Sequence, residues 1–475
     1  MDWIQINPLD NVGVALQDLA SGIPRGHKFA LKPIRKGEPV IKYGMPIGHA
    51  LEDIPEGAHV HTHNMKTNLD GILEYQWDPA KSDFKHLPCP ETFQGFRRKN
   101  GAAGIRNHLF IIPTVGCVNK LAANLANRIN RELPKGSLDR ALALEHPHGC
   151  SQLGSDHEMT RAILRGFVKH PNAGAVLVVG LGCENNTLDS FRESLGEFDS
   201  ERIRFMTAQN ETDEMETGMK ILRELADIAS KDKRETIPAS ELVVGLKCGG
   251  SDGMSGITAN PLVGRFSDWL TARGGSAILG EVPEMFGAET LLMARCRNRE
   301  TFDKCVKMIN DFKQYFTRYG QTIYENPSPG NKAGGISSLE DKSLGCTQKA
   351  GSSPVNDVLL PGEHPREHGL NLMTGPGNDM AAATLLASSG AQLILFTTGR
   401  GTPFGRVVPT LKIASNSALA KKKTNWIDFD AGRTLEENAD PDFIRLVLDT
   451  ASGKEALNER NGYEEIAIFK DGVTL

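Results

Sequence analysis

The chain has little of what marks a membrane or secreted protein. Its 475 residues contain no apolar run near the roughly 18–20 residues that a membrane-spanning helix requires. It begins Met1-Asp2-Trp3, without the basic region and apolar core of a secretory signal peptide. Cysteine is sparse, with 8 residues, and several lie beside glycine rather than in pairs, which argues against a disulfide scaffold. We therefore expect a cytoplasmic protein with reduced thiols and no membrane partner.

Positive charge and nucleotide-binding motifs are also scarce. The net charge is −5, and the one short basic run is Lys421-Lys422-Lys423, so nucleic acid is not expected as a partner. No G-x-x-x-x-G-K-[ST] phosphate-binding loop occurs. Gly180-Leu181-Gly182 begins like a dinucleotide fingerprint, but the third glycine is missing. The sequence thus gives no support to the two commonest nucleotide sites.

What is present indicates several globular domains, since 39% of the residues are apolar and 24% are charged. Residues 1–75 contain short, turn-separated β segments and predict a small β domain. Residues 76–94 have little periodicity and predict a linker. Residues 95–235 and 236–475 alternate strand-like and helix-like segments, so we predict two α/β domains with largely parallel sheets.

Three apolar, strand-like runs in the second domain end in Gly-Cys, and each is followed by a helix-like segment. Their cysteines, Cys117, Cys150 and Cys183, recur at equal spacing. Because parallel strands share one carboxyl edge, we expect these thiols to converge within reach of one metal centre, with Cys248 as a further ligand. Taken singly, each cysteine is better explained as a small buried hydrophobe, but the equal spacing and the identical placement at strand exits reverse that preference for these three. The other four cysteines, Cys89, Cys296, Cys305 and Cys346, lack this context and are expected to be ordinary residues.

A second candidate metal site lies in the first domain. If Gly57–Asn64 is a strand, its period-two alternation places His59, His61 and His63 on one face. His27 would join them from a neighbouring loop. Imidazole is the commonest metal ligand, but an exposed polar strand face explains the pattern equally well.

The third domain is expected to carry three glycine-rich polar loops, at residues 247–253, 326–335 and 398–403. Glycine lets backbone amides approach an anion closely, and each loop also carries a polar or cationic side chain that suits a carboxylate or hydroxyl groups. These loops predict a site for a small polar anion.

Long, uncommon strings along the chain are similar to those of a known family. They are Gly57–Asn64, Thr114–Asn119, Gly149–Gly154, Gly180–Asn186, Cys248–Gly253, Asn326–Lys332 and Thr397–Pro403. With them the chain resembles, nearly end to end, the altronate and galactarate dehydratase family of sugar-acid dehydratases. The resemblance implies an amino-terminal domain of the SAF or β-clip type, a carboxyl-terminal dehydratase region and dependence on Fe2+ or a similar divalent metal. The retained His-x-His-Asn string favours the altronate branch.

The expected activity is therefore dehydration of D-altronate to 2-keto-3-deoxy-D-gluconate in hexuronate catabolism, by a hydro-lyase that we expect to be a homodimer. Galactarate or another sugar acid is the alternative substrate, and an inactive sugar-acid-binding protein is the alternative from another class. The metal would be Fe2+, with Mn2+ or an iron–sulfur cluster with an open iron as alternatives. His61 and His63 suit a mononuclear ion, whereas three converging thiolates suit a cluster.

Dehydration of a 2,3-dihydroxy acid removes the proton beside the carboxylate and expels hydroxide from C3, so both steps need charge stabilisation. We assign catalytic roles to Asp252, Lys332 and His27, with Asp252 or a histidine as the base. Substrate binding is assigned to Ser251, Asn331, Arg400 and Thr402. Lys332 and Arg400 would bind the carboxylate, and Ser251, Asp252 and Asn331 the hydroxyl groups.

Overall fold

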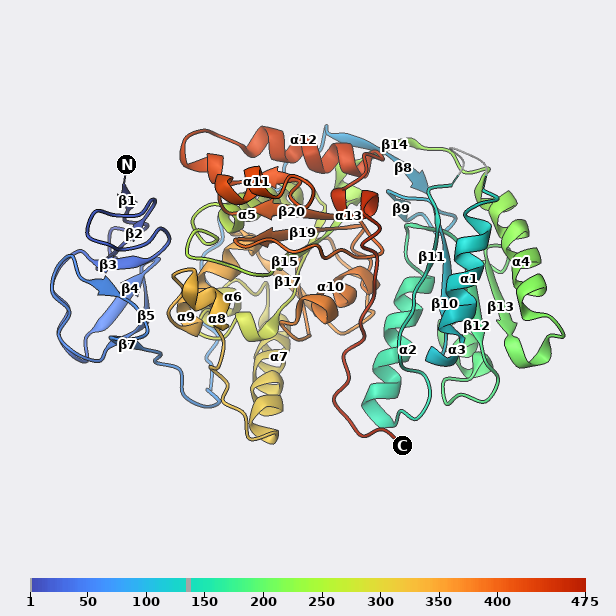
Figure 1. The fold of residues 1–475 in the computed structure, drawn as a ribbon, viewed down its shortest axis with the longest axis horizontal. Helices are drawn as coiled ribbons and strands as arrows, with labels where there is room; N and C mark the ends of the chain where they lie inside the picture. Colours follow the sequence, from blue (N-terminus) through green and yellow to red (C-terminus); the bar gives the residue numbers. More distant parts are fainter. Residues whose placement is uncertain (1, 134–137) are drawn as a thin grey trace.

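A computed structural model describes residues 2–133 and 138–475. Figure 1 shows three units in a row whose spatial order differs from their order in the chain. The carboxyl-terminal unit occupies the centre, with the amino-terminal unit on one side and the unit that follows it in sequence on the other. Residues contributed by the first unit can therefore reach only the central one.

The amino-terminal unit consists of two small antiparallel sheets. One has the order β1-β2-β3-β6 and the other the order β4-β5-β7. The strands are β1 (Trp3–Ile4), β2 (Val12–Ala15), β3 (Lys28–Ala30), β4 (Pro39–Lys42), β5 (Met45–Ala50), β6 (His59–Val60) and β7 (Met65–Lys66). Their inward apolar side chains form a core with Ala288 and Leu344 of the central unit. The expected small β domain is confirmed.

One strand of this unit is shorter than predicted. The pattern predicts a strand through His63, but β6 ends at Val60. The side chain of Asn64 accepts a hydrogen bond from the His61 amide at 3.0 Å and donates one to the His59 carbonyl at 2.9 Å. These two bonds turn the chain, so the three histidines do not share one strand face.

The second unit is a parallel sheet of order β11-β10-β12-β13. Its strands are β10 (His108–Pro113), β11 (Ala141–Ala143), β12 (Ala173–Gly180) and β13 (Ile203–Thr207). Its helices are α1 (Asn119–Ile129), α2 (Gly154–Val168), α3 (Leu188–Leu195) and α4 (Glu214–Ala229). Alternate residues of β10 enter opposite cores: Leu109 packs with α1 and α4, and Phe110 packs with α2 and α3. Both faces of the sheet are covered, which is why its strands read as continuous apolar runs.

A three-stranded antiparallel sheet connects the second and central units. It consists of β8 (Thr92–Arg97), β9 (Ala103–Gly104) and β14 (Glu235–Pro238), in the order β14-β8-β9. The core that contains α2 and α3 also contains residues of α10 in the central unit, so the two units share buried apolar surface. They form one packed body rather than two domains on a tether.

The central unit is built on seven parallel strands in the order β17-β18-β16-β15-β19-β20-β21. These strands are β15 (Val243–Cys248), β16 (Ser276–Leu279), β17 (Val355–Leu359), β18 (Gly369–Met373), β19 (Leu393–Thr398), β20 (Thr410–Ala414) and β21 (Phe429–Asp430). The chain builds outward from β15 in both directions, so the strand order reverses there. In such sheets the ligand crevice lies at the carboxyl ends of the strands, beside the reversal.

Nine helices of the described chain accompany this sheet. They are α5 (Ala259–Ala272), α6 (Glu289–Met293), α7 (Arg299–Arg318), α8 (Pro329–Ala333), α9 (Leu339–Cys346), α10 (Asp379–Ser388), α11 (Ser417–Lys422), α12 (Asp440–Ala451) and α13 (Leu457–Arg460). The predicted α/β class, with a small β domain in front, is confirmed. In the part of the chain that the structure describes, no helix combines the length and apolarity needed to cross a membrane.

Candidate active site

A cavity of about 900 Å³ lies at the carboxyl ends of β15, β16 and β18. The segments that follow these three strands form one side of it. The rest is formed by α7, the loop before α8, α8 and α9, and residues 467–470. This is the place at which the strand order predicts a ligand crevice. The cavity is large enough for a six-carbon acid with bound water.

Two polar side chains that the sequence singled out line this cavity. Ser251 is 2% exposed, and its hydroxyl group has no hydrogen-bond partner among the described residues. Asn331 is fixed because its amide donates to the Ser251 carbonyl at 2.8 Å and its oxygen accepts from Ser328 in the capping box that begins α8. A buried hydroxyl without a partner loses free energy unless a ligand or water satisfies it. Ser251 is therefore the cavity residue best prepared to bind a substrate hydroxyl group.

The cavity wall also carries charges that the sequence did not indicate. The ammonium group of Lys342 lies 2.8 Å from Glu284 Oε1, and both residues are 7% exposed or less. Burial lowers the pKa of Lys342, but the Glu284 carboxylate outweighs it and raises that pKa above its usual value. Lys247 is completely buried and binds Glu281 and, at 2.9 Å, Asp379. Lys342 is thus held as a cation beside the cavity.

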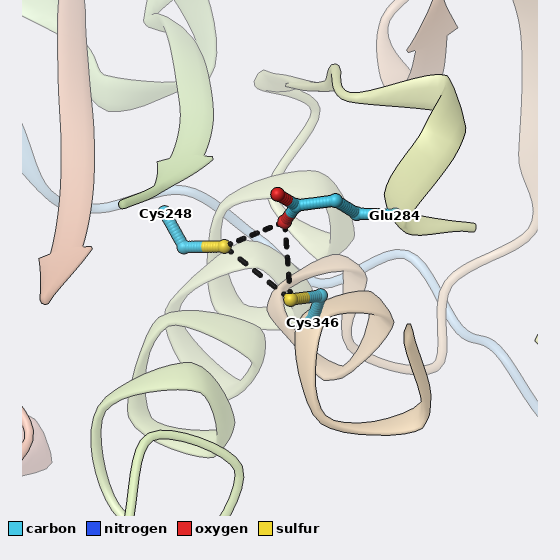
Figure 2. Close-up of side chains that lie close together, drawn as sticks. All are labelled: Cys248, Glu284 and Cys346. Atoms are coloured by element: carbon cyan, nitrogen blue, oxygen red, sulfur yellow. Dashed lines mark hydrogen bonds between the residues drawn. The ribbon is translucent and has the colours of Figure 1, made fainter. Parts of the chain in front are cut away.

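Glu284 of this wall also meets two buried thiols, as Figure 2 shows. The Cys248 and Cys346 sulfur atoms are 3.3 Å apart, and Glu284 Oε2 is 3.1 Å from the first and 3.3 Å from the second. The hydrogen bond from Cys248 and burial raise the pKa of the Cys346 thiol. Among the described residues, this is the one group of three His, Cys, Asp or Glu side chains whose ligand atoms all lie within 4.8 Å of one another.

The predicted histidines gather where the amino-terminal unit meets the central one. His27 Nδ1 is 3.0 Å from His59 Nε2, and His61 Nδ1 is 2.7 Å from Ser337 Oγ. The ring centroids of these three histidines are 5.1–5.5 Å apart, and the exposed His63 lies against His59 at 5.4 Å with its ring tilted by 43°. Burial lowers the pKa of His59 and His61 to about 4, so both rings are neutral at physiological pH. Neutral imidazole is the form that binds metals.

This histidine cluster is coupled to the cavity through one short segment. His27 Nε2 lies 3.3 Å from the Ala333 carbonyl, and Lys28 binds the Gly335 carbonyl at 2.7 Å. The same segment supplies Asn331 and Lys342 to the cavity wall. The amino-terminal unit therefore supports one wall of the candidate site.

Cys117, Cys150 and Cys183 follow three adjacent strands, β10, β11 and β12, and all three are exposed. Backbone hydrogen bonds join their loops, from the Asn186 amide to the Gly149 carbonyl at 2.9 Å and from the Gly116 amide to the His148 carbonyl at 2.8 Å. The loops thus meet at one sheet edge, but the three sulfur atoms do not form a group within 4.8 Å. Cys248 does not join them, because it lies in the central unit beside Cys346.

The remaining predicted residues lie around the cavity rather than in its wall. Asp252 accepts hydrogen bonds from Ser255 Oγ at 2.9 Å and Ser415 Oγ at 2.8 Å, and so links two loops. Arg400 is exposed and donates to the Gly330 carbonyl at 3.2 Å. Lys332 and Thr402 are half-buried and do not line the cavity.

Sequence reasoning missed Glu284, Lys342, Cys346 and Asp379. Glu284 ends a 3-10 turn, Val282–Glu284, after β16, and Lys342 and Cys346 lie on α9. All eight residues of α9 are buried, although its sequence Leu-Glu-Asp-Lys-Ser-Leu-Gly-Cys reads as a polar surface helix. The sequence carries no signal for these residues, and the positive φ of 72° at Glu281, directly before that turn, is visible only in the structure.

A second groove, of about 660 Å³, lies away from the central sheet edge and is rich in basic residues. Arg98 and Arg202 in it both bind Asp232, at 2.9 and 2.7 Å, and Arg97 binds Glu235 at 3.2 Å. Because its guanidinium groups are already neutralised, this groove is a weaker candidate for an anionic ligand.

Comparison with known proteins identifies related chains over the full length. Residues 18–68 match the family described as altronate/galactarate dehydratase SAF domain, residues 95–230 the second domain of D-galactarate dehydratase/altronate hydrolase, and residues 239–474 the carboxyl-terminal domain of D-galactarate/altronate dehydratase. The chain is 55% identical to altronate dehydratase of Escherichia coli K12, with 100% of both chains covered. It is 53% identical to altronate dehydratase of Bacillus subtilis 168, covering 100% of this chain and 99% of the relative. It is 33% identical to galactarate dehydratase (L-threo-forming) of Escherichia coli K12, covering 98% and 96%.

Proposed function

This chain belongs to the altronate/galactarate dehydratase family, and we propose that it is a hydro-lyase that dehydrates D-altronate to 2-keto-3-deoxy-D-gluconate in hexuronate catabolism. The observation that carries the proposal is the end-to-end identity of 53–55% with two altronate dehydratases. Galactarate is the second candidate substrate, with weaker support, because the galactarate dehydratase is only 33% identical.

The cavity contains the groups that a sugar acid requires. The Lys342 ammonium offers a positive charge to the substrate carboxylate, and the unpartnered Ser251 hydroxyl and the Asn331 amide face its hydroxyl groups. Lys342 remains protonated because Glu284 raises its pKa, so it stabilises negative charge rather than accepting a proton. Charge that develops on the carboxylate as the C2 proton leaves is then met by a fixed cation. Lys332 and Arg400 are the second candidates for the substrate carboxylate, and Thr402 remains a candidate for substrate binding, although none of the three lines the cavity.

Removal of the C2 proton needs an ionised, accessible base. Asp379 lines the cavity, keeps 39% of its side chain exposed and has one carboxylate oxygen fixed by Lys247 at 2.9 Å. We assign it the role of base in preference to Asp252, whose carboxylate links two loops outside the cavity wall. His27 remains a second candidate, through the segment that joins the histidine cluster to the cavity.

We also propose that the reaction depends on Fe2+, with Mn2+ or an iron–sulfur cluster with an open iron as alternatives. When bound, such a metal supplies Lewis-acid stabilisation of the enediolate and of the departing hydroxide. Three donor sets suit a metal: the neutral imidazoles around His61 and His63, the exposed thiols Cys117, Cys150 and Cys183, and the buried group that contains Cys248. Each has ligand types that iron accepts.

The direct test is to incubate the purified full chain anaerobically with Fe2+, a reductant and D-altronate, and to measure 2-keto-3-deoxy-D-gluconate. Galactarate and Mn2+ serve as parallel substrate and metal. Product from D-altronate at the higher kcat/KM supports the proposal, and product from galactarate alone would reassign the substrate. No product with either acid would favour the sugar-acid-binding alternative, which equilibrium binding of D-altronate then tests.

Two further expectations complete the proposal. The enzyme is expected to act in the cytoplasm and to form a homodimer. Light scattering on the full chain at several concentrations checks the second expectation, and a mass of one chain at all concentrations would contradict it.

A further inference from the structure

We infer that Cys248, Glu284 and Cys346 form a binding site for one divalent transition-metal ion at the wall of the cavity (Figure 2). The identification of this ion as the catalytic Fe2+ rests on the proposed function, whereas the site itself rests on the geometry. Three segments distant in sequence build it: the end of β15, the turn after β16 and the last residue of α9.

The three ligand atoms have the spacing that a bound ion requires. Their mutual separations are 3.1, 3.3 and 3.3 Å. Atoms this close can all contact one ion, given metal–oxygen distances of about 2.0–2.2 Å and metal–sulfur distances of about 2.3 Å. Cys248 and Cys346 are at most 3% exposed, so the ligands are held in place by packing.

A second set of side chains supports the ligands, as expected around a metal. Glu284 presents Oε2 to the sulfurs while its other oxygen, Oε1, accepts from Lys342 at 2.8 Å. Glu281 Oε2 accepts from the Cys248 amide at 3.1 Å. The carboxylate and one thiol are thus oriented before any ion binds.

Lys349 provides an independent indication of a ligand. It is completely buried, and its ammonium group has no hydrogen-bond acceptor among the described residues, although it forms an ion pair with Glu281 at 3.3 Å. It lies within electrostatic reach of both sulfur atoms. Binding of a divalent ion favours thiolates at positions 248 and 346, and these would supply negative charge near this buried cation.

The lysines around the group do not exclude a cation. The ammonium groups of Lys247, Lys342 and Lys349 face an equal number of carboxylates, those of Glu281, Glu284 and Asp379. Binding of a divalent ion releases one proton from each of the two thiols, so two metal–sulfur bonds form, two sulfur–hydrogen bonds break and the net charge of the site is unchanged. The cost of adding a charge to a buried site is therefore avoided.

The ion would lie where the substrate is expected. Glu284 and Lys342 both line the cavity, as do Gly249 and Ser251 immediately after Cys248. A metal bound to Glu284 Oε2 would therefore be at the wall rather than in an isolated core. This position distinguishes the group from a purely structural metal site.

The test uses Co2+ as a spectroscopic probe, because thiolate coordination gives a near-ultraviolet sulfur-to-cobalt charge-transfer band. The full chain is reduced, freed of metal and titrated anaerobically with Co2+, and bound cobalt is measured by elemental analysis. The variants are Cys248→Ser, Cys346→Ser and Glu284→Gln. Cys305→Ser is the matched control, since Cys305 is equally buried and lies outside the group. A variant with Cys117, Cys150 and Cys183 all changed to serine tests the exposed thiols.

We expect one cobalt per chain with the charge-transfer band, at least a tenfold loss of affinity in Cys248→Ser and Cys346→Ser, and no change in Cys305→Ser. Glu284→Gln should keep the band and lose affinity. Circular dichroism melting of each apo-variant separates loss of metal from loss of fold. Full binding by a folded Cys346→Ser variant, or loss of the band in the exposed-thiol variant, overturns the inference. A thiol reagent is also applied to the oxidised, denatured chain, which has eight cysteines. If it modifies only six of them and leaves Cys346 unmodified, Cys346 forms a disulfide, and the metal site is rejected.

These outcomes are separable from the proposed function. Dehydration of D-altronate by wild type together with normal cobalt binding by the folded Cys346→Ser variant would retain the function and reject the site. A cobalt band that depends on Cys346, in a chain that dehydrates neither sugar acid with any metal, would retain the site and reject the function.

Discussion

The ammonium group of Lys28 lies 2.8 Å from the carboxylate of Asp341, and both side chains are completely buried although they belong to different units. Lys42, also from the amino-terminal unit, binds the other oxygen of the same carboxylate at 2.9 Å. One aspartate on α9 thus holds two lysines of the small β unit. Because α9 ends at Cys346 and carries Lys342, this contact ties the small unit to the candidate active site.

We expect Asp341→Asn to weaken the attachment of the amino-terminal unit. Removing the carboxylate leaves two buried ammonium groups without a counter-charge, a loss of about 3–5 kcal/mol for a broken buried pair. The free energy of unfolding by urea measures this. Asp303→Asn is the control, because its pair with Arg299 is exposed (65% and 56%) and is worth at most about 1 kcal/mol. Equal, small effects of the two substitutions would contradict the structural role of Asp341.

The same carboxylate predicts an acid-sensitive contact. Burial raises the pKa of Asp341, but the ammonium groups of Lys28 and Lys42 outweigh it and hold that pKa well below the usual 3.8. A carboxyl group with a depressed pKa in the folded state contributes stability above its unfolded pKa and loses it as the pH falls below about 4. Wild type should therefore lose more unfolding free energy than Asp341→Asn between pH 5 and about 2. Parallel pH curves for the two proteins would rule this out.

Ser251→Ala should reduce catalysis without reducing stability. The lost substrate hydrogen bond is worth about 0.5–1.5 kcal/mol, so kcat/KM for D-altronate should fall about two- to tenfold. Stability should stay equal or rise slightly, because the hydroxyl has no partner among the described residues. Ser267→Ala is matched, since Ser267 is also buried and unpartnered but lies on α5, outside the cavity wall. Loss of activity in both variants would show that the effect is not specific to the cavity.

The sequence predicted the sheets because their local signals agree with the fold. The apolar run Ser276–Leu279 forms strand β16, and the segment Leu188–Leu195, which follows the capping residue Thr187, forms helix α3. Buried parallel strands appear in the sequence as apolar runs. The start of α3 is marked by its N-cap residue Thr187, whose hydroxyl group accepts a hydrogen bond from the Ser190 amide. The boundaries predicted for the four parts of the chain, 1–75, 76–94, 95–235 and 236–475, remain predictions, as do the roles of the candidate site residues.

The buried thiol–carboxylate group could not be predicted in the same way. Cys248 and Cys346 are 98 residues apart, and no sequence period relates a strand end to the end of a helix in another layer. Helix α9 is polar in sequence and yet buried, because its charged side chains have buried partners. Asp341 pairs with Lys28 and Lys42, and Lys342 pairs with Glu284. Composition alone therefore assigns it to the surface. Similarly, the strand predicted through His63 ends earlier, because hydrogen bonds of the Asn64 side chain turn the chain there.

The last prediction concerns the two cations that the sequence placed on the substrate carboxylate. Arg400→Ala and Lys332→Ala should reduce kcat/KM for D-altronate, because a charge-assisted hydrogen bond is worth about 1.5–3 kcal/mol, or roughly ten- to a hundredfold. Arg400 is exposed and Lys332 is only half-buried, so unfolding free energies should change by less than about 0.5 kcal/mol. Lys421→Ala, an exposed cation on α11, is the control.

Substitution of Arg400 can distinguish direct substrate binding from support of the loop that carries Asn331. Its guanidinium group donates to the carbonyl of Gly330, directly before Asn331 in the cavity wall, and neither Arg400 nor Lys332 lines the cavity itself. If Arg400 binds substrate, Arg400→Lys should restore part of the affinity, because the charge remains. If it only supports the Asn331 loop, Arg400→Lys and Arg400→Ala should be equally impaired, with kcat reduced more than the affinity for substrate. Wild-type kinetics in both Arg400→Ala and Lys332→Ala would leave Lys342 as the carboxylate-binding cation.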